Sequence, residues 1–553
     1  MTVASYTTDL TDLYTDNQGT WTLISSGGGG QNALTDPETD DLIQGANCVS
    51  RNGFSSSIRG IINNIGATTV ATDDAIYFWV KADIAAALNT TANGGIQVLV
   101  GSGTGAFDAY YVNGSDDAVG GWKCYVVDPT VTSSAQVGSP TATRSHFGAR
   151  WDIPGSGPSK GFPFKIDAIR HGRFTTITNG TSPDPAATFS GLATENDRND
   201  ASPNDNRWGQ FQENNGTYLF QGGLQLGTST TAVRFDDNSE GIFINDTPFV
   251  SSGFNRIEIN NASSEVSWTA ITITALGTTS PGTFEVVDNA TVTFDSCTFT
   301  DMGAFTFNGG TNANTITNTT FRRCGLVTQG AATFTGCTFE SGSSTTLLSA
   351  DTINFVTDCR FVSNGTGHAV DLGTIDTTGG DVTITWDNTL DDGAGTEWTG
   401  STGLVTSGGS TNSALLFATT GTNNVIIDVQ SGASIPTVRW TGTANSVDVQ
   451  AGNVTTTVTV TDVFTGSPLQ NARVLLEADT GGSLAVGTDI ISGLTDVNGQ
   501  ITDSRSFSGD QPVTGRVRRA SSGFGALYKT GNITGTISAT TGADFNIGLL
   551  PDE

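Results

Sequence analysis

The side chains best suited to acid–base chemistry lie together at one place late in the chain. Asp391, Asp392 and Glu397 are close in sequence to Trp398. A glycoside hydrolase needs two carboxylates about 5–10 Å apart, one as the acid and the other as nucleophile or base. Because Asp391-Asp392-Gly393 is also an ordinary turn sequence, we interpret the cluster as a turn and assign no catalytic role to it.

The three histidines, His146, His171 and His368, are far apart in the sequence. None has a serine or cysteine nucleophile motif beside it, so we interpret each as a surface or turn residue. The sequence contains no phosphate-binding loop, zinc motif or dinucleotide fingerprint. We therefore predict no catalytic, cofactor-binding or metal-binding residue, no cofactor and no enzymatic activity, with cleavage of a polysaccharide left open.

A repeated element between Thr291 and Leu372 organises this part of the chain. Four segments share one pattern: an apolar residue, any two residues, a small residue, one more residue and a phenylalanine. The phenylalanines are Phe299, Phe321, Phe339 and Phe361, which are 22, 18 and 22 residues apart. A period near 20 is typical of solenoids, whose coils stack because none can bury its inward face alone.

The two-residue alternation of a strand directs alternate side chains of each repeat inward. We predict that the four phenylalanines form one interior column and that the small residues form a second. The second column is Cys297, Thr319, Cys337 and Cys359, and the residues predicted to point outward are Thr298, Thr320, Thr338 and Arg360. This pattern resembles the right-handed parallel β-helix of pectate lyases and phage tailspikes, although no catalytic residue of those families matches a position here.

A lyase with a β-helix fold would place carboxylates for Ca²⁺ and a basic residue on one face of the coils. The nearest candidates in this sequence are Asp295, Asp301, Arg322, Arg323, Asp358 and Arg360. Their register does not bring them together, because Arg360 follows the outward threonines whereas Arg322 comes directly after a phenylalanine. We therefore interpret them as a polar outer face.

Six cysteines occur without a CxxC or Cys/His metal spacing: Cys48, Cys124, Cys297, Cys324, Cys337 and Cys359. Three of them belong to the predicted interior column, where cysteine acts as a small buried hydrophobe. We expect free thiols there. A disulfide between neighbouring coils is the alternative.

The composition indicates an all-β protein of two to four domains. The chain has 553 residues with 70 glycines but only 24 lysines and arginines, and long runs of helix-forming residues are absent. The net charge of -30 is interpreted as a source of solubility, with cation binding as the alternative. Because we see no basic stripe, nucleic acid is not expected as a partner.

The predicted domain order begins with residues 1–175, whose short aromatic and β-branched strands indicate a sandwich. The segments Tyr77–Val80 and Ile166–Gly172 resemble strands of concanavalin-type and laminin-G-type jelly rolls, families that often bind glycans. A connector is predicted over residues 176–215. Its polar stretches 196–200 and 203–206 lack the glycine and distal glutamate of an EF-hand loop, so we interpret them as solvated.

Residues 216–452 are predicted to form the β-helix, with about 10 to 12 coils over about 50–60 Å. Residues 453–553 change character. Their segments Gly466–Pro468 and Asp496–Gly499 are predicted turns, and they resemble the carboxypeptidase-regulatory or transthyretin-like sandwich. We expect Gly499 to adopt positive φ.

These features together favour a structural protein of a bacteriophage particle, such as a fibre, spike or capsid-decorating appendage. The first ten residues do not resemble a signal peptide, and no apolar run approaches 18 residues, so secretion and membrane insertion are not expected. A virion protein is made in the host cytoplasm and is extracellular after lysis. The expected partners are other virion proteins, two further copies in a homotrimer and host surface glycans. The alternatives are a tailspike depolymerase and a cellular surface adhesin.

Overall fold

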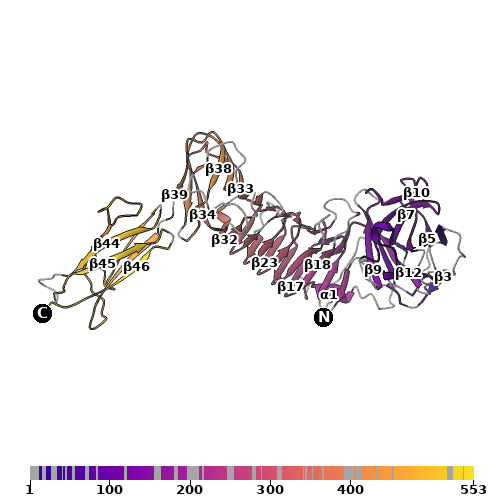
Figure 1. Cartoon of the computed structure of the whole chain (residues 1–553), viewed down its shortest axis with the longest axis horizontal. Coiled ribbons are helices and arrows are strands. Elements are labelled where there is room, and N and C mark those ends of the chain that lie inside the picture. The colour runs from indigo at the N-terminus through magenta and orange to yellow at the C-terminus, as the bar shows by residue number, and fades with distance from the viewer. Residues whose placement is uncertain are drawn as a thin grey trace. The chain divides into compact units, whose positions relative to one another are not determined.

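The computed structural model shows an almost entirely β protein, as the composition predicted (Figure 1). Helical structure among the described residues is limited to one short α-helix and three single-turn 3₁₀ helices. The structure describes residues 11–14, 20–26, 34–39, 41–43, 46–52, 57–68, 74–82, 85–116, 121–154, 163–179, 185–195, 211–214, 217–245, 249, 255–276, 282–287, 289–307, 314–340, 342, 346–351, 353–363, 367–391, 404–405, 413–430, 432–450, 452, 454–507, 509–519, 527–539 and 541–552.

The chain divides into two compact units, Met1–Thr333 and Phe334–Glu553. The first unit begins with an antiparallel sandwich and continues into parallel coils. The second unit begins with parallel coils and ends in another antiparallel sandwich. Among the described residues, no helix has both the length and the apolar character needed to cross a membrane.

The N-terminal sandwich consists of two antiparallel sheets. The first has the order β3-β4-β12-β6-β9 with β1 also paired to β12, and the second has the order β10-β8-β7-β11-β5-β2. The strands are β1 (Thr11–Tyr14), β2 (Thr20–Ser26), β3 (Leu34–Glu38), β4 (Cys48–Asn52), β5 (Ser57–Thr68), β6 (Ala75–Ala82), β7 (Ile96–Gly103), β8 (Ala106–Asn113), β9 (Gly121–Val127), β10 (Ala135–Val137), β11 (Arg144–Ile153) and β12 (Pro163–Gly172), with 3₁₀ helices η1 (Ala85–Ala87) and η2 (Thr91–Asn93).

Aromatic residues fill the space between these two sheets. Trp151 of β11 stacks on Phe164 of β12 with ring centroids 4.8 Å apart, and Tyr14 meets Trp21 edge to face at 5.0 Å. Such pairs stabilise a core beyond the contribution of their buried area. The predicted aromatic strand Tyr77–Val80 lies inside β6, which is buried along nearly its whole length.

The regular coils of the first unit contain three short parallel strands, and the period near 20 predicted two or three. Three ladders run through successive coils: β13-β16-β19-β22-β25-β28, β15-β18-β21-β24-β27 and β17-β20-β23-β26. Figure 1 shows β17, β18 and β23 within this stack. The elements are β13 (Phe174–Ile177), α1 (Phe189–Glu195), β14 (Phe211–Asn214), β15 (Thr217–Phe220), β16 (Gly223–Leu226), β17 (Arg234–Asn238), β18 (Gly241–Asn245), β19 (Arg256–Ile259), β20 (Glu265–Thr269), β21 (Thr272–Leu276), β22 (Thr283–Val286), β23 (Thr291–Asp295), β24 (Thr298–Thr300), β25 (Phe305–Thr306), β26 (Asn314–Thr317), β27 (Thr320–Arg322) and β28 (Val327–Thr328).

The range that the sequence suggested as a connector contains regular structure at both ends and in the middle. Strand β13 already pairs in parallel with β16, and β14 pairs with β15. Between them, α1 places Phe189 4.9 Å from the Phe235 ring and 5.8 Å from the Trp268 ring. Because a terminal coil has no preceding coil to cover its interior, the short helix supplies apolar cover that the sequence pattern did not predict.

The coils of the second unit are less uniform. Strands β29 and β30 both pair with the longer β32, while β31-β33-β36-β38 and β34-β37-β39 form parallel ladders. The elements are β29 (Ala332–Thr335), β30 (Thr338–Glu340), β31 (Thr346–Ser349), η3 (Ile353–Phe355), β32 (Val356–Val362), β33 (His368–Asp376), β34 (Val382–Asp391), β35 (Leu404–Val405), β36 (Ser413–Thr420), β37 (Val425–Val429), β38 (Val438–Gly442) and β39 (Val447–Gln450).

The predicted phenylalanine column is present within each unit. In the first unit Phe299 and Phe321 are register partners, and their rings stack 5.4 Å apart. In the second unit Phe339 and Phe361 are partners, and their rings stack 5.0 Å apart with planes only 9° from parallel. Stacking of equivalent residues in adjacent coils is what a parallel β-helix requires.

The C-terminal sandwich packs a sheet of order β43-β40-β46 against a sheet of order β42-β41-β44-β45. Both predicted turns are present, and Gly499 has the expected positive φ of 72°. The strands are β40 (Val454–Asp462), β41 (Arg473–Ala478), β42 (Asp489–Leu494), β43 (Gln500–Arg505), β44 (Gln511–Arg518), β45 (Gly531–Ile537) and β46 (Ala543–Leu549).

Candidate functional site

Several of the candidate acidic and basic residues occupy the corners of the coils. One residue at each corner has positive φ, so a single residue turns the chain from one strand to the next. These residues are Ser296, Asp301, Asn318 and Arg323 in the first unit and Gly336 in the second. Asp358 has positive φ at a bulge within β32. Asparagine, aspartate and glycine accept this conformation more readily than other residues, so the backbone explains Asp301 and Asp358 without chemistry.

The carboxylates at these corners bind neighbouring coils. Arg323 donates to both carboxylate oxygens of Asp301, at 2.7 and 2.8 Å, and this hydrogen bond lowers the pKa of Asp301. Asp295 accepts hydrogen bonds from Thr317 Oγ1 at 2.8 Å and Asn318 Nδ2 at 3.1 Å. The bond from Thr317 is the main cause that lowers the pKa of Asp295. Both carboxylates are therefore held ionised as links between coils.

The predicted cluster near Trp398 is only partly within the described residues. Asp391 of β34 forms an ion pair with Arg360, the outward residue of the fourth repeat, on the neighbouring strand β32. Asp392, Glu397 and Trp398 lie outside the described residues. The described member of the cluster is thus another link between coils.

One carboxylate that the sequence analysis did not single out lies near Asp358. Asp387 of β34 is the register partner of Thr357, and the bulge that follows leaves Asp358 as the extra residue of β32. Burial, and then the charge of Asp358, raise the pKa of Asp387. The sequence pattern did not predict the Asp358–Asp387 pair, because the spacing between β32 and β34 departs from the repeat of 18 to 22 residues.

The histidines do not form a general-base arrangement. His146 Nδ1 lies 2.8 Å from Ser145 Oγ, and burial lowers the pKa of His146. His171 Nδ1 lies 3.5 Å from an oxygen of Asp74.

His368 is the histidine closest to a nucleophile-like partner. Its Nδ1 lies 2.8 Å from Ser413 Oγ, and burial lowers the pKa of His368. The Ser413 hydroxyl donates its hydrogen to the Leu415 carbonyl at 2.7 Å and is 1 % exposed. A buried hydroxyl committed to a carbonyl is not poised to attack a substrate.

All six cysteines are buried and none forms a disulfide, in agreement with the thiols expected for Cys297, Cys337 and Cys359 in the interior column. Burial raises the pKa of Cys297 to about 11 and that of Cys324 to about 12. Cys337 and Cys359 occupy adjacent coils, since the Arg360 amide donates to the Cys337 carbonyl at 2.8 Å. A hydrogen bond with the Cys337 thiol raises the pKa of Cys359. Thiols in this state are poor nucleophiles.

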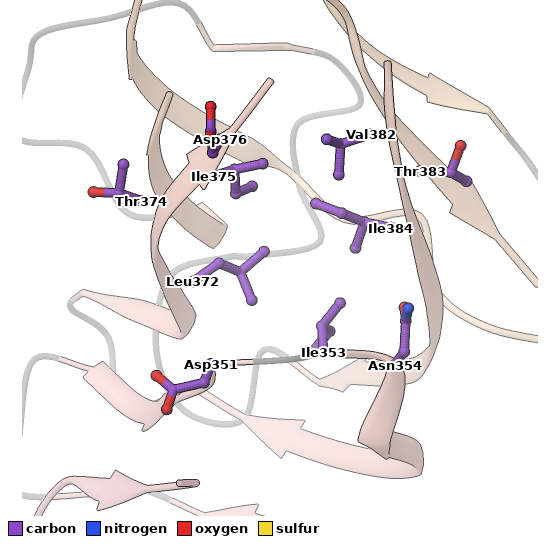
Figure 2. Close-up of a pocket in the computed structure, with 10 residues that line it drawn as sticks. All are labelled: Asp351, Ile353, Asn354, Leu372, Thr374, Ile375, Asp376, Val382, Thr383 and Ile384. Atoms are coloured by element: carbon purple, nitrogen blue, oxygen red, sulfur yellow. The ribbon is translucent and has the colours of Figure 1, made fainter. Parts of the chain in front are cut away.

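An open groove of about 250 Å³ lies in the second unit where the coil widens (Figure 2). Strands β33 and β34 extend past the coil before them, because β31 pairs with β33 only as far as Asp371 and β32 pairs with the last part of β34. Figure 2 shows Leu372, Ile375 and Ile384 turned toward one another over Ile353.

Two polar side chains at the margin of this groove accept hydrogen bonds from backbone amides of the chain. Asn354 Oδ1 accepts the Thr385 amide at 3.1 Å. Asp376 accepts the Thr378 amide at 2.9 Å, and this bond is the main cause that lowers the pKa of Asp376. Asp351, at the opposite margin (Figure 2), has no basic residue beside it in the lining. The groove therefore marks the place where the strands become longer, and the carboxylates Asp351 and Asp376 lie at its margin.

Among the described residues, no group of three or more His, Cys, Asp or Glu side chains is placed to hold a metal ion. The acidic stretches 196–200 and 203–206, which were weighed for Ca²⁺, lie outside the described residues.

No protein-family model matches the chain, and no curated protein matches it. Among solved structures, part of the chain is similar to the family 11 carbohydrate-binding module of Clostridium thermocellum in complex with a mixed-linked β-1,3-1,4 tetrasaccharide. The identity is 16%, the match covers 28% of this chain and 91% of the module, and the TM-score is 0.19.

A second similar structure is the K1 cleaved adhesin domain of Lys-gingipain from Porphyromonas gingivalis W83. The identity is 16%, the match covers 30% of this chain and 98% of the domain, and the TM-score is 0.17. Similarities of this size do not decide a family, a ligand or a function.

Proposed function

We propose that the chain is a structural protein of a surface appendage, specifically a fibre, spike or capsid-decorating component of a bacteriophage particle. In this proposal the coils are a stiff spacer that carries the sandwich domains. The protein is made in the host cytoplasm and acts outside cells after lysis. Its partners are other virion proteins, further copies of itself and surface glycans of the host, and it neither cleaves a substrate nor binds nucleic acid.

The observation that carries the proposal is that side chains on both faces of the coils hold neighbouring coils together. The interior holds stacked aromatic rings such as Phe339 and Phe361. On the exterior, ion pairs such as Arg323–Asp301 link successive coils. Corner carboxylates that neighbouring coils already hold, such as Asp295 and Asp301, are suited to joining coils rather than to acid–base catalysis.

Localisation of the protein tests this proposal directly. An antibody against the purified chain is expected to label phage particles isolated from the strain that encodes it, and peptides of the chain should occur in their digest. Genes for capsid or tail proteins are expected beside its gene. Label confined to the envelope of uninfected cells would instead support a cellular adhesin.

A depolymerase is the second candidate, and one observation favours it. Burial and the charge of the second carboxylate Asp358 raise the pKa of Asp387, and glycoside cleavage uses a carboxyl group with a raised pKa as its acid. Capsule or lipopolysaccharide from the host is the substrate to test. Release of oligosaccharide that is lost in Asp387→Asn, and retained in the corner variant Asp301→Asn, would establish the enzyme and overturn the non-catalytic proposal.

A further inference from the structure

The strongest feature outside the coils is a set of three arginines on one face of the C-terminal sandwich. Strands β41 and β44 are antiparallel, and their register pairs Arg473 with Arg518 and Leu475 with Arg516. The intervening residues Val474 and Val517 are buried. All three arginine side chains therefore lie on the outer face of the sheet, where they are exposed.

These arginines form a compact cationic surface. Side chains directly opposite each other in such a pair have Cβ atoms about 4.5–5.5 Å apart, and alternate residues of one strand are about 6.6–6.8 Å apart. Like charges in directly opposed positions destabilise a sheet. The Arg473–Arg518 pair therefore has an energetic cost that the fold of the sandwich does not explain.

No ion pair in the described part of this sandwich includes any of the three guanidinium groups. The ion pair found there joins Arg505 Nε to Asp503 Oδ2 at 3.4 Å, and both residues belong to β43 of the other sheet. The neighbours in register are Leu494 beside Arg473 and Asn532 beside Arg516. Two carboxylates lie further along β41 and β42, where Glu477 is in register with Thr514 and with Asp489.

This concentration of positive charge contrasts with the rest of the chain, whose net charge is -30. An anionic ligand is repelled by most of the surface and attracted to this face. Arginine binds carboxylate and phosphate groups through paired hydrogen bonds. Leu475 and the 55 % exposed Leu494 add apolar area between the charges, which suits the C–H faces of sugar rings.

We propose that the outer face formed by Arg473, Arg516 and Arg518 binds an acidic polysaccharide. The inference deepens the proposed function and rests on its glycan contact, because it names the charge class of the glycan and the residues that hold it. A single polysaccharide chain with spaced carboxylate or phosphate groups can follow three arginines. Duplex DNA has one charge per about 1.7 Å of its axis, far more charge than three arginines can neutralise.

The test is binding of the full-length chain to polygalacturonate, with dextran of similar length as the neutral probe and duplex DNA as the nucleic-acid probe. The wild type is expected to bind polygalacturonate at low salt, more weakly as salt rises, and to bind dextran and DNA less well. The triple variant Arg473→Gln, Arg516→Gln, Arg518→Gln is expected to lose at least about tenfold in affinity.

A charge-matched control separates the site from general electrostatics. The variant Arg234→Gln, Arg323→Gln, Arg360→Gln removes three exposed arginines that are paired with carboxylates, and its affinity should stay within about twofold of the wild type. The site variant should melt no lower than the wild type, because it removes a like-charge pair. Retained folding then shows that lost binding is not lost structure.

Three results would overturn the inference: unchanged polygalacturonate binding in the site variant, equal binding of dextran and polygalacturonate, or stronger binding of DNA that the site variant loses. If the wild type binds none of the probes, this inference and the glycan contact fail together. The structural role is judged separately, by the presence of the chain in isolated particles.

Discussion

At the scale of single residues, the corners of the coils determine which polar side chains are available for chemistry. Asp301 and Arg323 each turn the chain with positive φ and pair with each other across adjacent coils. The same positions that attracted attention in the sequence as potential catalytic groups are occupied by residues that tolerate a left-handed turn. The charges of Asp301 and Arg323 are therefore expected to affect the stability of the fold and not catalysis.

The Arg323–Asp301 pair provides a test at this scale. Both side chains are well exposed, so Arg323→Gln should lower the free energy of unfolding by only about 0.2–1 kcal/mol at pH 7. The pKa of Asp301 is lowered in the folded protein, so the contribution is present above the unfolded pKa and lost as pH falls through the folded value. Urea unfolding should show the difference shrinking below about pH 4.

The control for this prediction is a double-mutant cycle. In the Asp301→Asn background, Arg323→Gln should have little further effect at either pH. A difference between wild type and Arg323→Gln that is the same at neutral and acidic pH would show that the arginine acts through packing.

At the scale of elements, the short strands are held by what they place in the interior. A strand such as β30 has only three residues, too few to be stable alone. The stacked rings from successive strands supply the buried apolar area that joins them. Stability of each coil is therefore expected to depend on its aromatic residue more than on its hydrogen bonds to solvent-facing loops.

Two phenylalanines close in sequence allow the same substitution to be compared at a buried and at an exposed position. Phe361 is fully buried and Phe355 is 51 % exposed. Phe361→Ala should lower the free energy of unfolding of its unit by about 3–5 kcal/mol through cavity formation, whereas Phe355→Ala should change it by less than about 0.5 kcal/mol. Denaturant unfolding followed by tryptophan fluorescence measures both, and equal effects would refute the interior column.

The predicted turns of the C-terminal sandwich offer a matched pair of glycines. Gly466 and Gly499 have φ of 69° and 72°, so alanine at either position has a left-handed strain of about 1–2 kcal/mol. A Cβ at Gly499 would lie 2.5 Å from the Val460 carbonyl oxygen. A Cβ at Gly466 would have no neighbouring atom within 4 Å. Gly499→Ala should therefore lower the melting temperature more than Gly466→Ala. Equal losses would mean that the turn relaxes around the new methyl group.

At the scale of the whole molecule, repetition and net charge have opposite effects on association. Each coil buries its interior against its neighbours and leaves an outer face that another copy can cover. A net charge of -30 opposes association, most strongly at low salt. Threefold association, which we propose for this chain, would bury one face of each copy.

The oligomeric state follows from a mass measurement in solution. Light scattering after size-exclusion chromatography should give about three times the 57.1 kDa chain mass at physiological salt. A mass of one chain at all concentrations would refute the homotrimer. The site variant described above serves as a control and should keep the mass of the wild type.

Composition and periodicity alone determined that this protein is all-β, that its centre is a stack of coils and that Phe299, Phe321, Phe339 and Phe361 point inward. Those signals are local, because a pleat alternates every two residues and a coil repeats about every 20. The helix that covers the first coil, the Asp358–Asp387 pair and the Arg473–Arg518 pair depend on which distant segments become neighbours. Only the tertiary structure decided them, since register between strands far apart in sequence is fixed by packing of the whole fold and not by the pattern of either strand.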